Sequence, residues 1–200
     1  MERFPECDAI RLEGIDAARE AGAAHLRALS LDGPVIGISP GAAYGNAKRW
    51  LPERFAEAAM ELREHAHSFL VFGAPSERDL CQAVTSDLLR AGLAVRNLAG
   101  QTTLAQFIDL AAACELFLTN DSGAMHVASA LGVPTVAVFG ATDAAATGPT
   151  GPLARIVYRH AECSPCLLRD CPIDHRCMTR VTASEVAAEA LALWTPAAKS

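Results

Sequence analysis

The sequence lacks an apolar run long enough to cross a membrane. The longest candidate, residues 125–141, is interrupted by His126, Gly132 and Pro134. The first residues also lack the charged-then-apolar pattern of a signal peptide. These two absences predict a cytoplasmic protein. Positive charge is scarce as well: the net charge of −6 argues against a nucleic-acid groove as the main function, so no nucleic-acid partner is expected.

Three common motifs of enzymes and cofactor-binding proteins are also absent. The chain has no Gly-Lys-Ser/Thr of a Walker A loop. It has no Gly-x-Gly-x-x-Gly fingerprint, which argues against a nicotinamide cofactor. It shows no nucleophile elbow or Ser-His-Asp pattern, which disfavours a stand-alone hydrolase.

What the chain does have is enough apolar material for one large domain. Of its 200 residues 51% are hydrophobic. From residue 34 onward, short apolar runs alternate with helical patterns, which is typical of a doubly wound α/β domain with a mainly parallel sheet. We expect a lead-in or linker segment over 1–30, containing a helix, and one domain over 31–200 with a Cys-rich loop at 160–178. Strands are expected at 35–38, 68–72, 93–98, 115–119, 135–139 and 155–158, and helices at 15–29, 52–64, 76–91, 103–114, from the Asn120–Ser122 cap to 131, and after Thr182.

Residues 119–139 organise this pattern, because they form a strand, a tight turn, a helix and a second strand. The helix begins at the carboxyl end of a strand, where free N–H groups and the helix dipole favour a phosphate. The alternative is that Asp121 and Ser122 only cap the helix. Because the polar loops follow strands, the loops at Gly41, Gly73, Asp121 and Gly140 should meet at one edge of the sheet.

Three further side chains are candidates for this edge. Lys48 follows a Gly-containing loop and could neutralise a diphosphate; otherwise it is a solvated surface charge. Glu77 could accept hydrogen bonds from a ribose; otherwise it only complements a helix dipole. His126 lies one turn after Ser122 and could donate to a phosphate oxygen; otherwise it is a satisfied buried histidine.

Four of the seven cysteines are clustered, and they favour a structural zinc site. Cys163, Cys166, Cys171 and Cys177 lie within fifteen residues, and four thiolates suit tetrahedral Zn²⁺. The spacing is irregular, so free thiols in a packed loop or a labile disulfide stay open as alternatives. Cys81 and Cys114 are expected to pack as small apolar residues.

Three blocks together resemble glycosyltransferase family 9, the bacterial lipopolysaccharide heptosyltransferases. They are residues 40–50 (PGAAYGNAKRW), residues 119–126 (TNDSGAMH), and the cysteine block from Cys163 to Met178. The resemblance runs from about residue 30 to the end. The cysteine block narrows it toward the type II enzymes of the family.

The resemblance implies the donor-binding, Rossmann-like C-terminal domain of a GT-B glycosyltransferase, in which ADP-L-glycero-β-D-manno-heptose donates heptose with inversion. No metal is required for the chemistry; any zinc would be structural. Lys48 and Asp121 would be the catalytic residues, with Lys48 on the diphosphate. The other donor contacts implied are Ala43 and Tyr44 through the backbone, Glu77 at the adenosine ribose, Ser122 and Gly123 at the phosphates and sugar, and His126 behind them.

The resemblance also implies that the acceptor half of such an enzyme is absent from this chain. That half would bind the Kdo–lipid A–heptose acceptor at the inner face of the inner membrane, with peripheral membrane association, and would supply an Asp general base. The chain alone is then expected to bind donor but to transfer little. Two other hypotheses stay open: a GT-B enzyme using a UDP- or GDP-sugar, and a non-catalytic nucleotide-binding or zinc-stabilised module.

Overall fold

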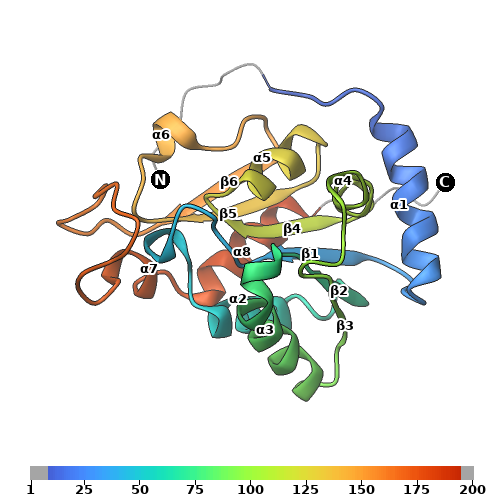
Figure 1. The fold of residues 1–200 in the computed structure, drawn as a ribbon, viewed down its shortest axis with the longest axis horizontal. Helices are drawn as coiled ribbons and strands as arrows, with labels where there is room; N and C mark the ends of the chain where they lie inside the picture. The colour runs from blue at the N-terminus through green and yellow to red at the C-terminus, as the bar shows by residue number, and fades with distance from the viewer. Residues whose placement is uncertain (1–8, 195–200) are drawn as a thin grey trace.

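The computed structural model describes residues 9–194, and its six strands form one sheet in which every neighbouring pair is parallel (Figure 1). The strand order is β3-β2-β1-β4-β5-β6. This order reverses direction between β1 and β4, which is the hallmark of the doubly wound fold, and the predicted fold class is confirmed. The strands are β1 Val35–Ser39, β2 Ser68–Val71, β3 Ala94–Asn97, β4 Leu116–Asn120, β5 Thr135–Phe139 and β6 Ala154–Tyr158.

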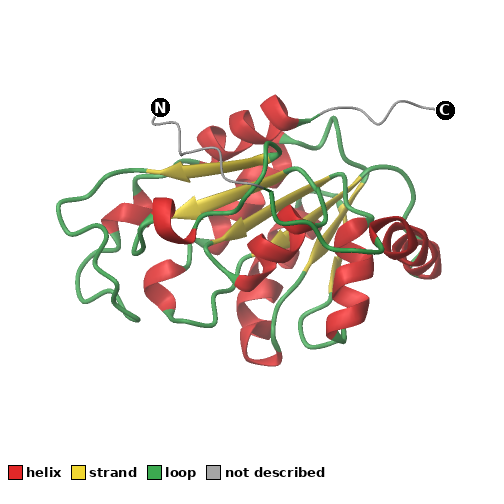
Figure 2. Cartoon of the chain, turned by 90° about the horizontal axis from the view of Figure 1, so that it is seen from above, coloured by secondary structure: helices red, strands yellow, loops and turns green. Residues whose placement is uncertain are grey.

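Helices cover both faces of the sheet. Helices α2, α3 and α8 pack together on one face, and α1, α4 and α5 lie on the other. Figure 2 shows the strands as a layer between helices, with their arrowheads directed toward one edge. The helices are α1 Ile15–Ala28, α2 Pro52–Glu61, α3 Arg78–Arg90, α4 Leu104–Ala112, α5 Gly123–Ala130, α6 Ala144–Thr147, α7 Arg176–Thr179 and α8 Ala183–Leu193, with 3₁₀ turns at Asn46–Lys48 and Pro75–Glu77.

The alternation of side chains along each strand fills apolar clusters on both faces of the sheet. In β4, Leu116 and Leu118 pack with the α2, α3 and α8 side, whereas Phe117 packs with the α1, α4 and α5 side. All three side chains are fully buried. Apolar residues on both faces of a strand are what a sheet covered on both sides requires.

The predicted helix within the first thirty residues is present and packs on the domain. Helix α1 lies along α4 (Figure 1), where a Cβ at Gly22 would meet the Asp109 carbonyl oxygen at 2.0 Å. Residues 1–8 of that segment lie outside the described part of the chain. Within the described residues, no helix is both long and apolar enough to span a bilayer.

One predicted helix start was wrong. The helix predicted over 76–91 starts later, because α3 begins at Arg78 after the 3₁₀ turn Pro75–Glu77. Within this turn the buried Glu77 carboxylate accepts the backbone N–H of Ala74 at 2.9 Å, a charge-assisted bond that stabilises the turn.

Candidate functional site

The loop after β1 is fastened to the end of β4 by one buried amide. Asn120 Nδ2 donates to the Pro40 carbonyl at 2.7 Å, and Asn120 Oδ1 accepts the Trp50 backbone N–H at 2.9 Å. Both Asn120 and the Trp50 indole, which donates to the Val181 carbonyl, are essentially inaccessible to solvent. The amide thereby fixes both ends of the loop 40–50 at the edge where β1 and β4 diverge.

A buried ion pair lies at this edge. Lys48 Nζ is 2.6 Å from Asp121 Oδ2, although the two residues are 73 positions apart. Thr142, in the loop after β5, donates its hydroxyl to the same oxygen at 2.5 Å. The Lys48 side chain is 14% exposed and the Asp121 side chain 5%. A charge buried to this degree is tolerated because it is paired and hydrogen-bonded.

Two cations flank the aromatic ring of Tyr44, next to this pair. Lys48 Nζ lies 5.1 Å from the ring centroid and the Arg169 guanidinium 5.7 Å. The tyrosine hydroxyl donates to the Leu167 carbonyl at 3.0 Å. Tyr44 itself is 45% exposed. The ring thus holds the ammonium group of Lys48 from one side while Asp121 holds it from another.

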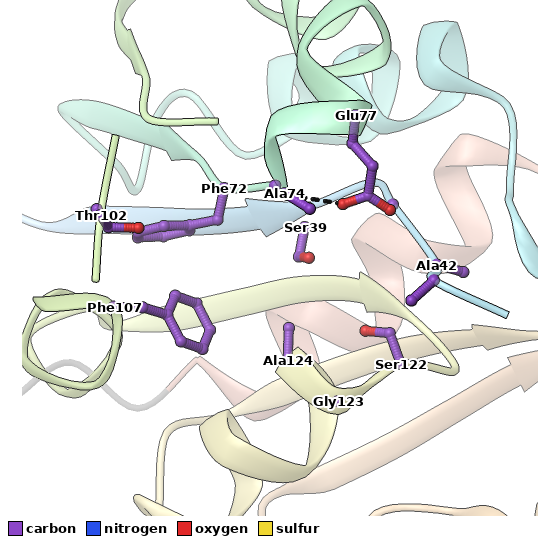
Figure 3. Close-up of a pocket in the computed structure, with 13 residues that line it drawn as sticks. Ser39, Ala42, Phe72, Ala74, Glu77, Thr102, Phe107, Ser122, Gly123 and Ala124 are labelled. Carbon is purple, nitrogen blue, oxygen red and sulfur yellow. Dashed lines mark hydrogen bonds between the residues drawn. The ribbon is translucent and has the colours of Figure 1, made fainter. Parts of the chain in front are cut away.

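A pocket of about 230 Å³ opens beside the ion pair, between the loops after β1, β2 and β4 (Figure 3). Glu77 lines it, and Arg49 Nη2 approaches the Glu77 carboxylate to 3.7 Å. A Cβ at Gly41 would lie 2.2 Å from that carboxylate, so only glycine permits this approach. The lining residues are Ser39, Gly41, Ala42, Ala43, Phe72, Gly73, Ala74, Glu77, Thr102, Phe107, Ser122, Gly123 and Ala124.

The N-terminus of α5 faces the same pocket without a side-chain cap. Ser122 occupies the N-cap position with extended backbone, but in the described structure its hydroxyl makes no capping bond and instead lies 3.2 Å from Thr119 Oγ1. Ser122 therefore holds the N-cap position through its backbone, and the alternative that its side chain only caps the helix is wrong. Gly123 has open space where a Cβ would be. The first N–H groups of α5 are left to water or a ligand.

The structure brings most of the predicted site residues together. Ala43, Glu77, Ser122 and Gly123 line the pocket. Lys48 and Asp121 form the adjacent ion pair and Tyr44 contacts Lys48, so these two polar clusters occupy neighbouring parts of one edge. His126 is exposed on α5 and is not among the lining residues. The alternative of a buried histidine at that position is wrong.

Several site residues were not found from the sequence. Thr142 and Arg49 were missed because a lone Thr or Arg carries no spacing signal. Phe72 and Phe107 line the pocket with ring centroids 5.1 Å apart, but in the sequence they are typical core residues. Asn120 could have been found as a polar residue ending a strand that is otherwise apolar.

The Cys-rich loop touches the loop that carries Lys48 and the loop that carries Thr142. The Ala47 N–H donates to the Arg169 carbonyl at 2.9 Å, and the Cys171 N–H donates to Asn46 Oδ1 at 3.0 Å. On the other side, the Leu167 N–H donates to the Ala141 carbonyl at 2.8 Å. The loop therefore supports residues 44–47 and 140–141 mainly through backbone contacts.

The four clustered cysteines all lie in the Cys-rich loop at 160–178. Burial, and after it the neighbouring Cys163, Cys166 and Cys171 thiols, together raise the pKa of Cys177 to about 11. Within residues 9–194, no group of three or more His, Cys, Asp or Glu side chains is arranged to hold a metal ion. Zinc at these cysteines stays a prediction. Cys81 and Cys114 are buried as small apolar residues, as predicted, and Cys7 lies outside the described residues.

Comparisons with known proteins agree with this geometry. The family model described as glycosyltransferase family 9 (heptosyltransferase) matches residues 10–176. Lipooligosaccharide heptosyltransferase 2 of Campylobacter jejuni serotype O:6 is 36% identical over 165 residues, covering 81% of this chain and 52% of the relative. Lipopolysaccharide heptosyltransferase 2 of Escherichia coli K12 is 40% identical over 130 residues, covering 64% of this chain and 37% of the relative.

The solved structure of the E. coli ADP-heptose lipopolysaccharide heptosyltransferase II superposes with a TM-score of 0.74 at 31% identity, covering 95% of this chain and 53% of that one. The fold is that of a Rossmann-like half of a GT-B glycosyltransferase. The chain belongs to glycosyltransferase family 9, the heptosyltransferases. It spans about half the length of the Campylobacter relative and of the solved E. coli structure.

Proposed function

We propose that this chain is the donor-binding half of a heptosyltransferase that moves heptose from ADP-L-glycero-β-D-manno-heptose to the inner core of lipopolysaccharide. The observation that carries the proposal is the pairing of Lys48 with Asp121 next to the uncapped N-terminus of α5. Family membership and the 31% identity to an ADP-heptose enzyme of known structure support it.

In this reaction the donor-binding half would stabilise the diphosphate of ADP as it leaves. An acceptor hydroxyl forms a bond to the anomeric carbon of heptose from the face opposite the diphosphate, and the bond from that carbon to the β-phosphate oxygen breaks. The electron pair leaves with ADP, and the hydroxyl proton goes to a general base on the acceptor half. Lys48 and the first N–H groups of α5 are placed to meet the negative charge as it develops on the diphosphate.

The pocket beside the pair has the features of a nucleoside site. Phe72 and Phe107 supply apolar surface for a base, and Glu77 supplies a carboxylate for ribose hydroxyls. The Arg49 guanidinium lies 3.7 Å from the Glu77 carboxylate and forms an ion pair with it. Ala43 and Tyr44 would contact the phosphates through their backbone, and His126 would stand behind them on α5.

We place the acceptor, the heptose of Kdo–lipid A, on the part of the relatives' length that this chain does not span. Because that acceptor is a lipid, the whole enzyme would work at the inner face of the inner membrane through peripheral association. No metal is assigned to the transfer itself.

A structural zinc held by Cys163, Cys166, Cys171 and Cys177 is a separate proposal. Four thiolates suit tetrahedral Zn²⁺, and these four cysteines lie together in the Cys-rich loop. Metal analysis of the purified chain should find about one zinc, and Cys163→Ser should lose it together with thermal stability. A metal-free protein whose melting temperature is unchanged in Cys163→Ser would eliminate the zinc.

Calorimetric titration with ADP, UDP and GDP tests the donor proposal. Selective binding of ADP is expected. Preference for UDP or GDP would favour a GT-B enzyme with another sugar nucleotide. A folded chain that binds none of the three, with or without an added acceptor half, would leave a non-catalytic module as the better account.

A further inference from the structure

Asp121 is the residue on which three separate loops converge. Its Oδ2 accepts both the Lys48 ammonium group, from the loop after β1, and the Thr142 hydroxyl, from the loop after β5. Its backbone N–H donates to the Val138 carbonyl at 3.3 Å. Within residues 9–194 both of the side-chain hydrogen bonds of Asp121 go to Oδ2.

The Thr142 hydroxyl does not cap the helix that follows it. The short helix α6 that follows is capped by the neighbouring Asp143, whose Oδ1 accepts the Ala145 N–H at 2.9 Å. Thr142 instead directs its hydroxyl toward a carboxylate of a different loop, 21 residues earlier in the chain. The hydrogen bond of the Thr142 hydroxyl therefore links its loop to Asp121 and does not stabilise its own turn.

The contact constrains a torsion that is otherwise soft. Rotation of an aspartate carboxylate about its terminal bond has broad wells, and a lysine side chain has four rotatable bonds and no fixed direction. A β-branched threonine, by contrast, is stiff about its first side-chain torsion. The hydroxyl of Thr142 therefore fixes Asp121 Oδ2 in space, and Oδ2 in turn fixes the Lys48 ammonium group.

We propose that Thr142 is a positioning residue of the donor site, which orients Asp121 so that Lys48 points its remaining N–H donors at the diphosphate. An ammonium group has three donors, and in the structure Asp121 takes one. Without Thr142 the carboxylate can rotate, and Lys48 follows it away from the phosphates. The inference rests on the proposed function, because it assumes a diphosphate ligand at this edge.

Calorimetric titration of the 200-residue chain with ADP tests it, using Thr142→Val, Thr142→Ser and the control Thr147→Val. Thr147 makes only a local bond to the Asp143 carbonyl in the same loop. Thr142→Val should weaken ADP binding about tenfold or more, as expected for a lost hydrogen bond to a charged group. Thr142→Ser should stay within about twofold of the original chain, because it keeps the hydroxyl, and Thr147→Val should bind ADP like the original chain. Thr142→Ala serves in place of valine should Thr142→Val not fold.

A double-mutant cycle with Lys48→Ala separates positioning from a general structural effect. If Thr142 acts through Asp121 on Lys48, then Thr142→Val costs no further affinity once Lys48 is gone. Equal ADP affinity of Thr142→Val and the original chain, equal losses in the serine and valine variants, or full additivity with Lys48→Ala would each overturn the inference. Failure of the original folded chain to bind ADP would instead refute the proposed function, and the inference with it.

Discussion

The carboxyl ends of the strands and the Cys-rich loop at 160–178 are neighbours that differ in how deeply their side chains are buried. At the edge, Thr119 and Asn120 are fully buried and Asp121 nearly so. In the loop, Leu167 is 61% exposed and Ile173 56%. Throughout residues 9–194, every fully buried side-chain nitrogen and oxygen has a hydrogen-bond partner, whereas the ion pairs of Arg176 with Asp174 and Glu162 lie in solvent.

The difference shows which of the two regions sets precise geometry. Residues far apart in the chain meet at the edge within 2.6 Å because adjacent parallel strands deliver them there in fixed register. The loop has no strand to align it and reaches the site through a few contacts to residues 44–47 and 140–141. Substitutions at the edge should therefore be costly, and substitutions on the exposed side of the loop should not.

Lys48→Ala should show the largest effect. It removes the positive charge that meets the diphosphate and leaves the buried Asp121 carboxylate without its ion-pair partner, so we expect ADP affinity to fall about 100-fold. Arg90→Ala is the control, because Arg90 is exposed at the far end of α3 and pairs with Asp87. Calorimetry measures both variants; equal affinity in the two would remove Lys48 from the site.

Asn120→Ala should lower the stability of the folded domain. The variant leaves the Trp50 N–H and the Pro40 carbonyl without their buried partner, and we expect the free energy of unfolding to fall by about 2 kcal/mol. Gln82→Ala removes an exposed amide that bonds to the side chains of Ser86 and Asn97, and it should cost less than half as much. Urea unfolding followed by circular dichroism gives both values. Similar losses of stability in the two variants would contradict the claim that the Asn120 amide fastens the loop 40–50 to the end of β4.

The buried Cys81 thiol should make the folding stability of the domain fall at alkaline pH. Burial raises the pKa of Cys81 to about 12, whereas a thiol in the unfolded chain titrates near ~8.5. Above that pH the unfolded state releases a proton that the folded state retains, so stability falls as pH rises from about 9 toward 12, by up to about 1.4 kcal/mol per pH unit from this thiol. Urea midpoints measured at rising pH should fall less steeply in Cys81→Ala; identical slopes would show that Cys81 does not contribute.

Leu167→Ser should have the smallest effect. The side chain is largely exposed, and its contacts to the site run through its backbone carbonyl and N–H. We expect a change within about 0.5 kcal/mol in unfolding free energy and unchanged ADP affinity. Urea unfolding measures the stability of this variant, and a calorimetric titration measures its ADP affinity. A loss of stability as large as that of Asn120→Ala would contradict the difference proposed between the two regions.

The fold could be predicted from the sequence because its strands and helices have strong local signals. The run Thr135–Phe139 matches β5 residue for residue. The helices predicted to start at Thr103 and after Thr182 do so, with these two threonines as their N-caps. Lys48 and Asp121 were predicted for one edge, because parallel strands bring their ends together. Thr142 was not, since its role depends on a contact between two loops that no local pattern records. The 3₁₀ turn before α3 and the short helices α6 and α7 were missed for a related reason, as they follow tertiary contacts more than propensity.

The most direct test of the central claim is a titration of the isotopically labelled chain with ADP, followed through its backbone amide resonances. We predict that the shifted resonances cluster in residues 41–49, 73–77, 121–124 and 140–143, at the carboxyl edge of the sheet, with UDP and GDP causing smaller changes. Shifts centred instead on the opposite edge, for example on the cavity lined by Ile15, Gly132 and Leu153, would contradict the assignment of this edge as the donor site.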